Sequence, residues 1–420
     1  MELRMGSFNL SSLPCMENLF EDTSVDVSVE VGDAAEVAEE TTEATEVATD
    51  VQEDTAEASD TETTTELLFQ HIDTLINRKM YLETYGYDRR FAMLASQDGV
   101  DYIQGGAPAV ESVNDVSSVN DSYTIAALEG VGDALKSAWD WIKKVLGKIA
   151  NWVSRFFRSV VMMFSSLENN IIRLKKLKNE STWDNDRATK ASGDIPDVSD
   201  TDISDAITNN KGGSHVFSGV KNNDDVVKKI KDEYNTIISW ATTDLREDKA
   251  TASGDYVAGS KTRKGTSNYV NDSDPVAYGK FKTDNDKVKA DKEATKKMID
   301  ALKKVADKKT SISNATDNSV DNLLTLAVSL CKIKTSLNNL GNVAAKAAST
   351  AKKQAEKFSA LNSNDGKVSV DTSKSFKKIT SYLSYLQSFT AKYCGALIKI
   401  ANWLVKGAAK VLGACYKKNK

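Results

Sequence analysis

The chain has 420 residues, of which 40% are hydrophobic and 27% are charged, a composition that suits two or three globular domains. Its charge is unevenly divided. Residues 1–129 hold 28 acidic and 5 basic residues, a net charge of −23, whereas residues 130–420 hold 32 acidic and 50 basic residues, a net charge of +18. The only histidines are His71 and His215, which leaves little material for acid–base catalysis near neutral pH or for a histidine-rich metal site. We therefore expect a protein that is not an enzyme and that holds no metal or cofactor.

Cysteine spacing and hydropathy limit the classes further. The four cysteines show no zinc-knuckle or redox-pair spacing and are predicted to be free, buried thiols in a reducing compartment: Cys15, Cys331, Cys394 and Cys415. The amino terminus lacks a basic region followed by an apolar run, so no secretory signal is expected. No stretch of about 18 residues is free of charge, so no conventional membrane-spanning helix is expected.

The acidic part begins with a segment that is unsuited to folding by itself. From Glu21 to Glu66 the chain has 17 acidic residues and neither a basic nor an aromatic residue. Such a segment buries too little apolar surface to offset its conformational entropy, so residues 1–62 are predicted to be a disordered leader. Thr63 and Glu66 have the spacing of a capping box and predict the start of a short amphipathic helix that ends near Gly86. Residues 97–124 are rich in Gly, Ser, Asn and Asp and predict a loop, so 63–129 is expected to be a short helix plus loop.

The basic part, residues 130–420, is predicted to be mainly α-helical. Apolar residues recur every three or four positions, which is the spacing of one helical face. Helices are expected near 131–178 (or two helices broken near Gly147), 224–247, 285–309, 318–361 and 374–416. The connections 179–222 and 248–283 are expected to be loops or to hold short strands. The predicted fold is a bundle or an elongated array of long amphipathic helices.

Two of these helices share a five-residue sequence. KIANW occurs at 148–152 and again at 399–403. Duplication of an ancestral helix and independent solutions to the same packing problem both remain open from the sequence.

The junction between the acidic and the basic part contains a candidate cleavage site. Ala127, Leu128, Glu129 and Gly130 end an uncharged run in a region that is predicted to be an exposed loop, where proteases cut. Cleavage after Glu129 would convert a precursor of charge −5 into a product of charge +18. A domain boundary that is never cut is the alternative interpretation.

The combination of features resembles the internal head proteins of giant tailed bacteriophages. It consists of the acidic leader, the segment ETYGYDRRFAMLASQDG at 83–99, an Ala-x-Glu motif and a basic helical remainder. The resemblance implies that the leader directs the protein into the prohead core and that the prohead protease cuts after Glu in a small-residue-x-Glu motif. A second candidate site is Ala109, Val110, Glu111 and Ser112, and the motif also occurs at 28–30, 34–36 and 166–168.

The resemblance further implies a location inside the virion head, with synthesis in the bacterial host cytoplasm. Expected partners are the prohead protease, prohead core and capsid proteins, and double-stranded DNA bound without sequence preference. Many basic side chains suit phosphate neutralisation, although a solvated lysine-rich surface explains any single one equally well. The candidate DNA-proximal residues are Lys143, Lys144, Lys148, Arg155, Arg158, Arg173, Lys175 and Lys176.

A membrane-active helical effector held inactive by the acidic segment is the alternative function. Two helices place aromatic residues on an apolar face and Lys or Arg opposite, as interfacial helices do. The residues that would contact a host membrane are Trp139, Trp152, Phe156 and Trp403. The two functions are compatible if the protein is ejected into the host with the genome.

Overall fold

The computed structural model describes residues 41–85, 121–209, 217–239, 285–365 and 370–419, together with residue 241 and strand pairs between 246 and 270. Predictions for the first 40 residues, including Cys15, lie outside the described residues. The same holds for 86–120, which contain the second candidate cleavage site and most of the segment 83–99, and for His215.

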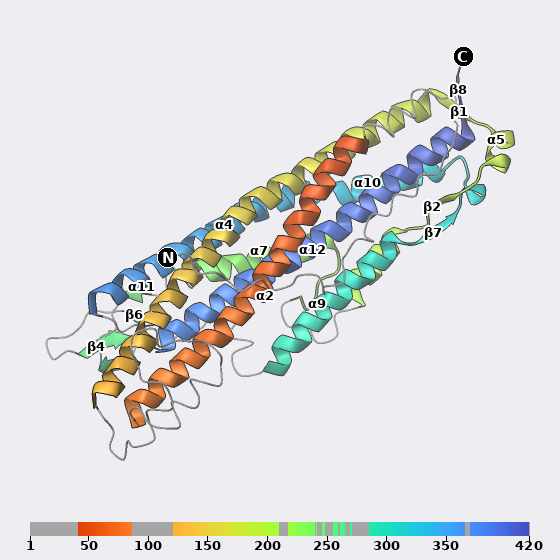
Figure 1. Ribbon diagram of the computed structural model, residues 1–420. Coiled ribbons are helices and arrows are strands. Elements are labelled where there is room, and N and C mark those ends of the chain that lie inside the picture. The colour runs from red at the N-terminus through yellow and green to blue at the C-terminus, as the bar shows by residue number, and fades with distance from the viewer. Residues whose placement is uncertain are drawn as a thin grey trace.

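The described residues form an elongated bundle of long helices, which confirms the mainly α prediction (Figure 1). The longest helices are α2 (Thr41–Tyr85), α4 (Asp121–Asn179), α11 (Lys334–Asp365) and α12 (Val370–Cys415). Helix α4 packs along α2, α11 and α12, and α2 also packs on α12. The shorter helices α7 (Asn223–Ser239), α9 (Asn285–Ala306) and α10 (Ser319–Cys331) complete the bundle, with α9 and α10 on α12 and α7 on α11.

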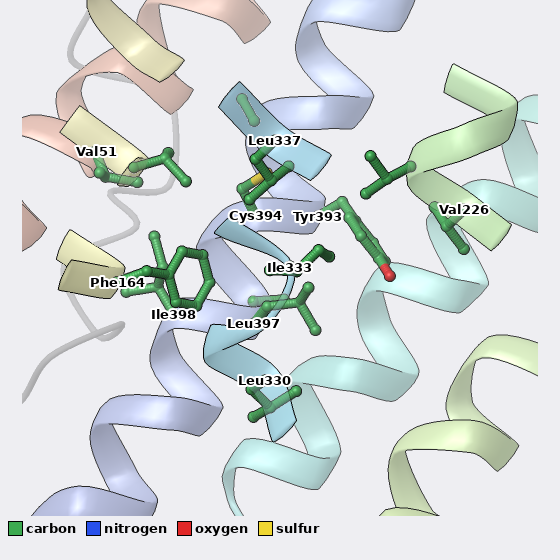
Figure 2. Close-up of a cluster of buried hydrophobic side chains, with 14 of the residues drawn as sticks. Val51, Phe164, Val226, Leu330, Ile333, Leu337, Tyr393, Cys394, Leu397 and Ile398 are labelled. Atoms are coloured by element: carbon green, nitrogen blue, oxygen red, sulfur yellow. The ribbon is translucent and has the colours of Figure 1, made fainter. Parts of the chain in front are cut away.

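The core runs along α12, whose apolar stripe the sequence predicts. Figure 2 shows Leu397 and Ile398 of α12 among side chains from α2, α4, α7, α10 and α11. Within this cluster Phe164 of α4 is fully buried, as is Leu337 of α11. Helices α4 and α12 therefore bury the face that their three-and-four spacing predicts, and transfer of this apolar surface from water stabilises the bundle.

Short strands and helices connect the long helices at the carboxyl-terminal end of α12. Strand β1 (Ser181–Trp183) pairs antiparallel with β8 (Tyr416–Lys418), and β2 (Asp194–Pro196) pairs antiparallel with β7 (Lys309–Ser311). The small helices α5 (Asn185–Lys190) and α6 (Asp200–Thr208) are capped by Asp184 and by a Ser199–Asp202 capping box. The 3-10 turn η5 (Ile312–Asn314) follows β7.

Two further antiparallel pairs lie between α7 and α9, and all of their strands except β3 fall within the connection 248–283. They are β3 (Arg246–Glu247) with β6 (Tyr269–Val270), and β4 (Asp255–Ala258) with β5 (Lys261–Lys264). Both connections therefore contain short strands, one of the two possibilities that the sequence leaves open.

Several helix boundaries differ from the predicted ones. The helix that is predicted over 224–247 ends at Ser239, and its last two predicted residues form strand β3 instead. Helix α4 is continuous through Gly147 and begins at Asp121, ten residues earlier than predicted, so the expected loop around Gly130 is wrong. The helix that is predicted over 318–361 is two helices, because the chain turns between Cys331 and Lys334. The predicted disorder of 41–62 is also wrong, because these residues are the first half of α2.

The repeated KIANW sequence makes the same two kinds of contact in α4 and α12. Ile149 and Ile400 are both fully buried. The indole N–H of Trp152 donates to the main-chain oxygen of Asp54 at 2.7 Å, and that of Trp403 donates to the main-chain oxygen of Lys308 at 3.2 Å. In each case the sequence buries an isoleucine and uses a tryptophan to bond the backbone of another segment.

Candidate functional site: an acidic helix on a basic bundle

Helix α2 packs on the bundle with a buried stripe of small and polar residues. Over 51–65, where every side chain is described, the buried positions follow three-and-four spacing and are small or polar: Val51, Asp54, Ala58, Thr61 and Thr65. Because small side chains allow close approach of two helices, this stripe can lie against α4 and α12 without a wide apolar face. The aliphatic pattern on which a prediction of amphipathicity depends is absent from the first half of α2.

Three threonines of α2 bond their own hydroxyl groups within the helix. Thr61 Oγ1 donates to the Glu57 carbonyl at 2.8 Å, and Thr65 Oγ1 donates to the Thr61 carbonyl at 2.6 Å. Thr55 bonds in the same way to the Val51 carbonyl at 2.7 Å. A buried hydroxyl that bonds the carbonyl four residues earlier avoids the cost of an unpaired polar group, so threonine can occupy this interface.

Arg155 of α4 ties the acidic helix to the basic bundle. Its Nε and Nη2 atoms both lie 2.7 Å from Asp54 Oδ1, and its Nη2 also pairs with the Glu57 carboxylate. The Asp54 side chain is only 4% exposed, whereas that of Arg155 is 56% exposed. The hydrogen bond from the Arg155 guanidinium to Asp54 is the largest cause that raises the arginine's pKa above its ordinary value. The Asp54 carboxylate of this ion pair is therefore shielded from water, whereas the Arg155 side chain is in contact with it.

Two further contacts join α2 to the helices beside it. Thr65 Oγ1 lies 3.1 Å from Ser384 Oγ of α12, and both residues are fully buried. Glu62 Oε1 lies 3.1 Å from Lys292 Nζ of α9. Carboxylates of α2 therefore meet cations from two different helices of the basic part.

A cavity of about 320 Å³ lies beside the Glu62–Lys292 pair, between α9 and α12. Lys296 and Lys303 of α9 and Lys392 of α12 also line it, and its aromatic wall includes Tyr385. Nothing in the spacing of these residues along the chain predicts that they meet, because α9 and α12 are separated by two other helices.

The eight candidate DNA-proximal residues all lie on α4 but differ in their exposure and their ion pairs. Five of them are exposed and make no ion pair with any described residue: Lys144, Lys148, Arg158, Lys175 and Lys176. Arg155 is engaged by the acidic helix, and Lys143 pairs with Asp140 one turn away at 2.5 Å. Arg173 is half-buried. Lys144, Lys148 and Arg158 share one side of α4 by their helical spacing and form its basic surface. Lys175 and Lys176 lie near the end of the helix, and Arg155 belongs to the α2 interface.

The candidate cleavage residues Ala127, Leu128, Glu129 and Gly130 lie in the first turns of α4. Ala127 is 1% exposed and Val131 5% exposed. The motif at 166–168 is also helical, and its Glu168 pairs with Lys334. Cleavage after Glu129 would require this part of α4 to unwind, since a helical, partly buried backbone is a poor protease substrate.

Two of the four candidate membrane residues contribute to the core. Trp152 and Phe156 are 1% and 0% exposed, and their rings stack with centroids 4.4 Å apart. Trp403 is half-buried, and Trp139 lies in α4 among residues whose side-chain burial is not described. No described helix has the length and apolarity needed to cross a membrane.

The cysteines of the described part are free and buried, as predicted: Cys331, Cys394 and Cys415. Burial raises the pKa of the Cys394 thiol to about 12 and that of Cys331 to about 12. His71 lies half-buried on α2. No three His, Cys, Asp or Glu side chains gather at metal-ligand spacing within the described ranges.

No family model, curated protein sequence or solved structure matches this chain.

Proposed function

We propose that the chain is the precursor of a non-enzymatic internal head protein, cut by a prohead protease and packaged with DNA in a bacteriophage capsid. The observation that carries this proposal is the docking of the acidic helix α2 on the basic bundle through Asp54, Glu57 and Glu62. An acidic segment that binds the protein's own cations competes with any external polyanion for them. A leader of this kind weakens DNA binding by the basic part until the capsid is ready for the genome.

The basic surface of α4 supports DNA as the partner of the mature protein. Lys144, Lys148 and Arg158 remain exposed while α2 is docked, and separation of α2 would add Arg155 to them. Phosphate neutralisation by such side chains requires no sequence reading and weakens steeply with salt. The apolar faces of α4 and α12 are used within the bundle, so we prefer this function to the membrane-active effector.

The bounds of the helices support an order for the two cuts. Cleavage at Glu111 falls between α2 and α4 and leaves α4 intact. Cleavage at Glu129 removes the first nine residues of α4 and becomes possible only when that end of the helix opens. We propose that Glu111 is cut first and that Glu129 is the final site.

The test is the intact mass and amino-terminal sequence of the protein recovered from particles. We expect the mature chain to begin at Gly130, and the Glu129→Gln variant to yield a chain that begins at Ser112. The Glu111→Gln variant is the reciprocal control and should still yield Gly130, although more slowly. A chain that still begins at Met1 in finished particles would refute the precursor model.

A further inference from the structure

The cavity beside Glu62 has more positive than negative charge in its wall. Four lysines line it, Lys292, Lys296, Lys303 and Lys392, against the carboxylates of Glu62 and Asp300. With α2 in place the lining therefore carries a net charge of +2, and without Glu62 it carries +3.

Three of the four lysines have no counter-ion in the described part of the chain. Lys292 pairs with Glu62 at 3.1 Å. Lys296, Lys303 and Lys392 make no ion pair or hydrogen bond with a described residue, although Lys303 and Lys392 are half-buried. Like charges around one partly enclosed space repel one another, and an anion in the cavity would relieve that repulsion.

One further wall residue suits an oxyanion, because Ser388 of α12 is buried and contributes a hydroxyl group. Thr295 Oγ1 donates to the Lys292 carbonyl oxygen at 3.0 Å and lies 3.1 Å from Tyr385 Oη, so these two hydroxyl groups bond to the protein and fix the wall between α9 and α12. Lys292 Nζ lies 5.8 Å from the centre of the Tyr385 ring. Lysine ammonium groups on flexible stems, next to hydroxyl groups, are common ligands of phosphate oxygens.

We propose that this cavity is a phosphate-binding site and that the Glu62 carboxylate of α2 occupies one of its anion positions in the precursor. Its ligand is a phosphate group, either of the DNA backbone or of a free polyphosphate. The DNA source rests on the proposed function, whereas the site itself does not.

The first experiment measures the binding of inorganic pyrophosphate to the full chain by calorimetry at low salt. The pocket variant is K296Q/K303Q/K392Q. The matched control is K297Q/K304Q/K406Q, which removes the same charge from exposed positions on the same two helices that do not line the cavity. We expect the pocket variant to bind pyrophosphate at least about tenfold more weakly than the unaltered chain, and the control variant to bind it less than about twofold more weakly. The reason is that the interaction between charges falls with distance and is screened by salt.

The second experiment tests the role of Glu62. The Glu62→Gln variant should bind pyrophosphate several-fold more tightly, since Lys292 is then free of that carboxylate. Glu53→Gln, an exposed position on the same helix, changes the net charge equally and should leave the affinity unchanged. Equal weakening by the two triple variants, or equal tightening by the two glutamate variants, would overturn the site, because net charge alone would then explain binding.

A duplex of about 20 base pairs separates the two phosphate sources. If the pocket variant weakens duplex binding more than its control does, the site takes the DNA backbone. If pyrophosphate binding depends on the pocket but duplex binding does not, the phosphate site stands with a free polyphosphate as ligand, and this contact with DNA is refuted.

Discussion

The ion pair between Arg155 and Asp54 allows a quantitative test of what holds α2 on the bundle. We consider Arg155→Met, which removes the guanidinium but keeps an apolar stem over the interface. The matched control is Arg158→Met, one turn along α4, where the arginine is exposed and has no ion pair to a described residue.

The expected magnitude follows from the burial of the two partners. A hydrogen bond to a charged group contributes about 1.5–3 kcal/mol, and loss of the partner of a buried carboxylate costs more than loss of an exposed pair. The Arg155 side chain is 56% exposed, which screens the interaction, whereas that of Asp54 is 4% exposed. We therefore expect Arg155→Met to weaken α2 docking by about 2 kcal/mol and Arg158→Met by less than about 0.5 kcal/mol.

The assay is hydrogen exchange across Thr41–Tyr85, read by mass spectrometry. A loss of about 2 kcal/mol corresponds to about 30-fold faster exchange through local opening of the helix. A double-mutant cycle with Asp54→Ala should give a coupling energy of at least about 1 kcal/mol, because the two side chains are in direct contact. Equal exchange in the two methionine variants, or a coupling energy near zero, would show that Arg155 does not hold α2.

Three further predictions can be tested by measuring the free energy of global unfolding. A Cβ at Gly341 would lie 2.8 Å from Phe157 Cβ, so Gly341→Ala should destabilise the protein by about 1–3 kcal/mol in urea titrations, whereas Gly147→Ala, with no atom closer than 3.8 Å, should not. Gln387 is fully buried and its two amide atoms lack hydrogen-bond partners in the described bundle, so Gln387→Leu should stabilise by about 1 kcal/mol, and a loss of stability would refute this. The pKa of the Cys394 thiol is raised from 9.0 to about 12, so its contribution to stability is complete below pH 9 and is lost as the pH rises toward 12. The unfolding free energy should fall between about pH 9 and 11, less steeply in Cys394→Ala; equal slopes would count against ionisation of this thiol.

The main features of the basic part could be predicted from the sequence. The apolar residues of α4 and α12 recur at helical spacing, and burial of that stripe in a helical bundle requires no further information. Ile149, Trp152 and Phe156 are buried as this spacing predicts, and the three described cysteines are buried as their type predicts. The mainly α fold was therefore determined locally.

The start of α4 could not be predicted from local preference. Gly130 and Gly132 suggest a loop, because glycine costs about 1 kcal/mol in a helix interior. In the folded chain Ala127 and Val131 are nearly inaccessible to solvent, so packing outweighs that cost and the candidate cleavage site becomes helical. Its predicted accessibility depended on the loop, and only the tertiary structure shows that a cut after Glu129 would require the helix to open.

The acidic helix shows most clearly what the sequence determined and what it did not. Seventeen carboxylates between Glu21 and Glu66 establish that the segment is acidic and that it cannot fold on its own apolar surface. Its order from Thr41 depends on contacts with residues about 100 to 320 positions away, Arg155, Lys292 and Ser384. Ion pairs and small-residue packing of this kind leave no periodic apolar signal in the segment itself. The acidic helix and the lysine cavity beside it were therefore decided by the tertiary structure, because only the folded chain brings these charges together.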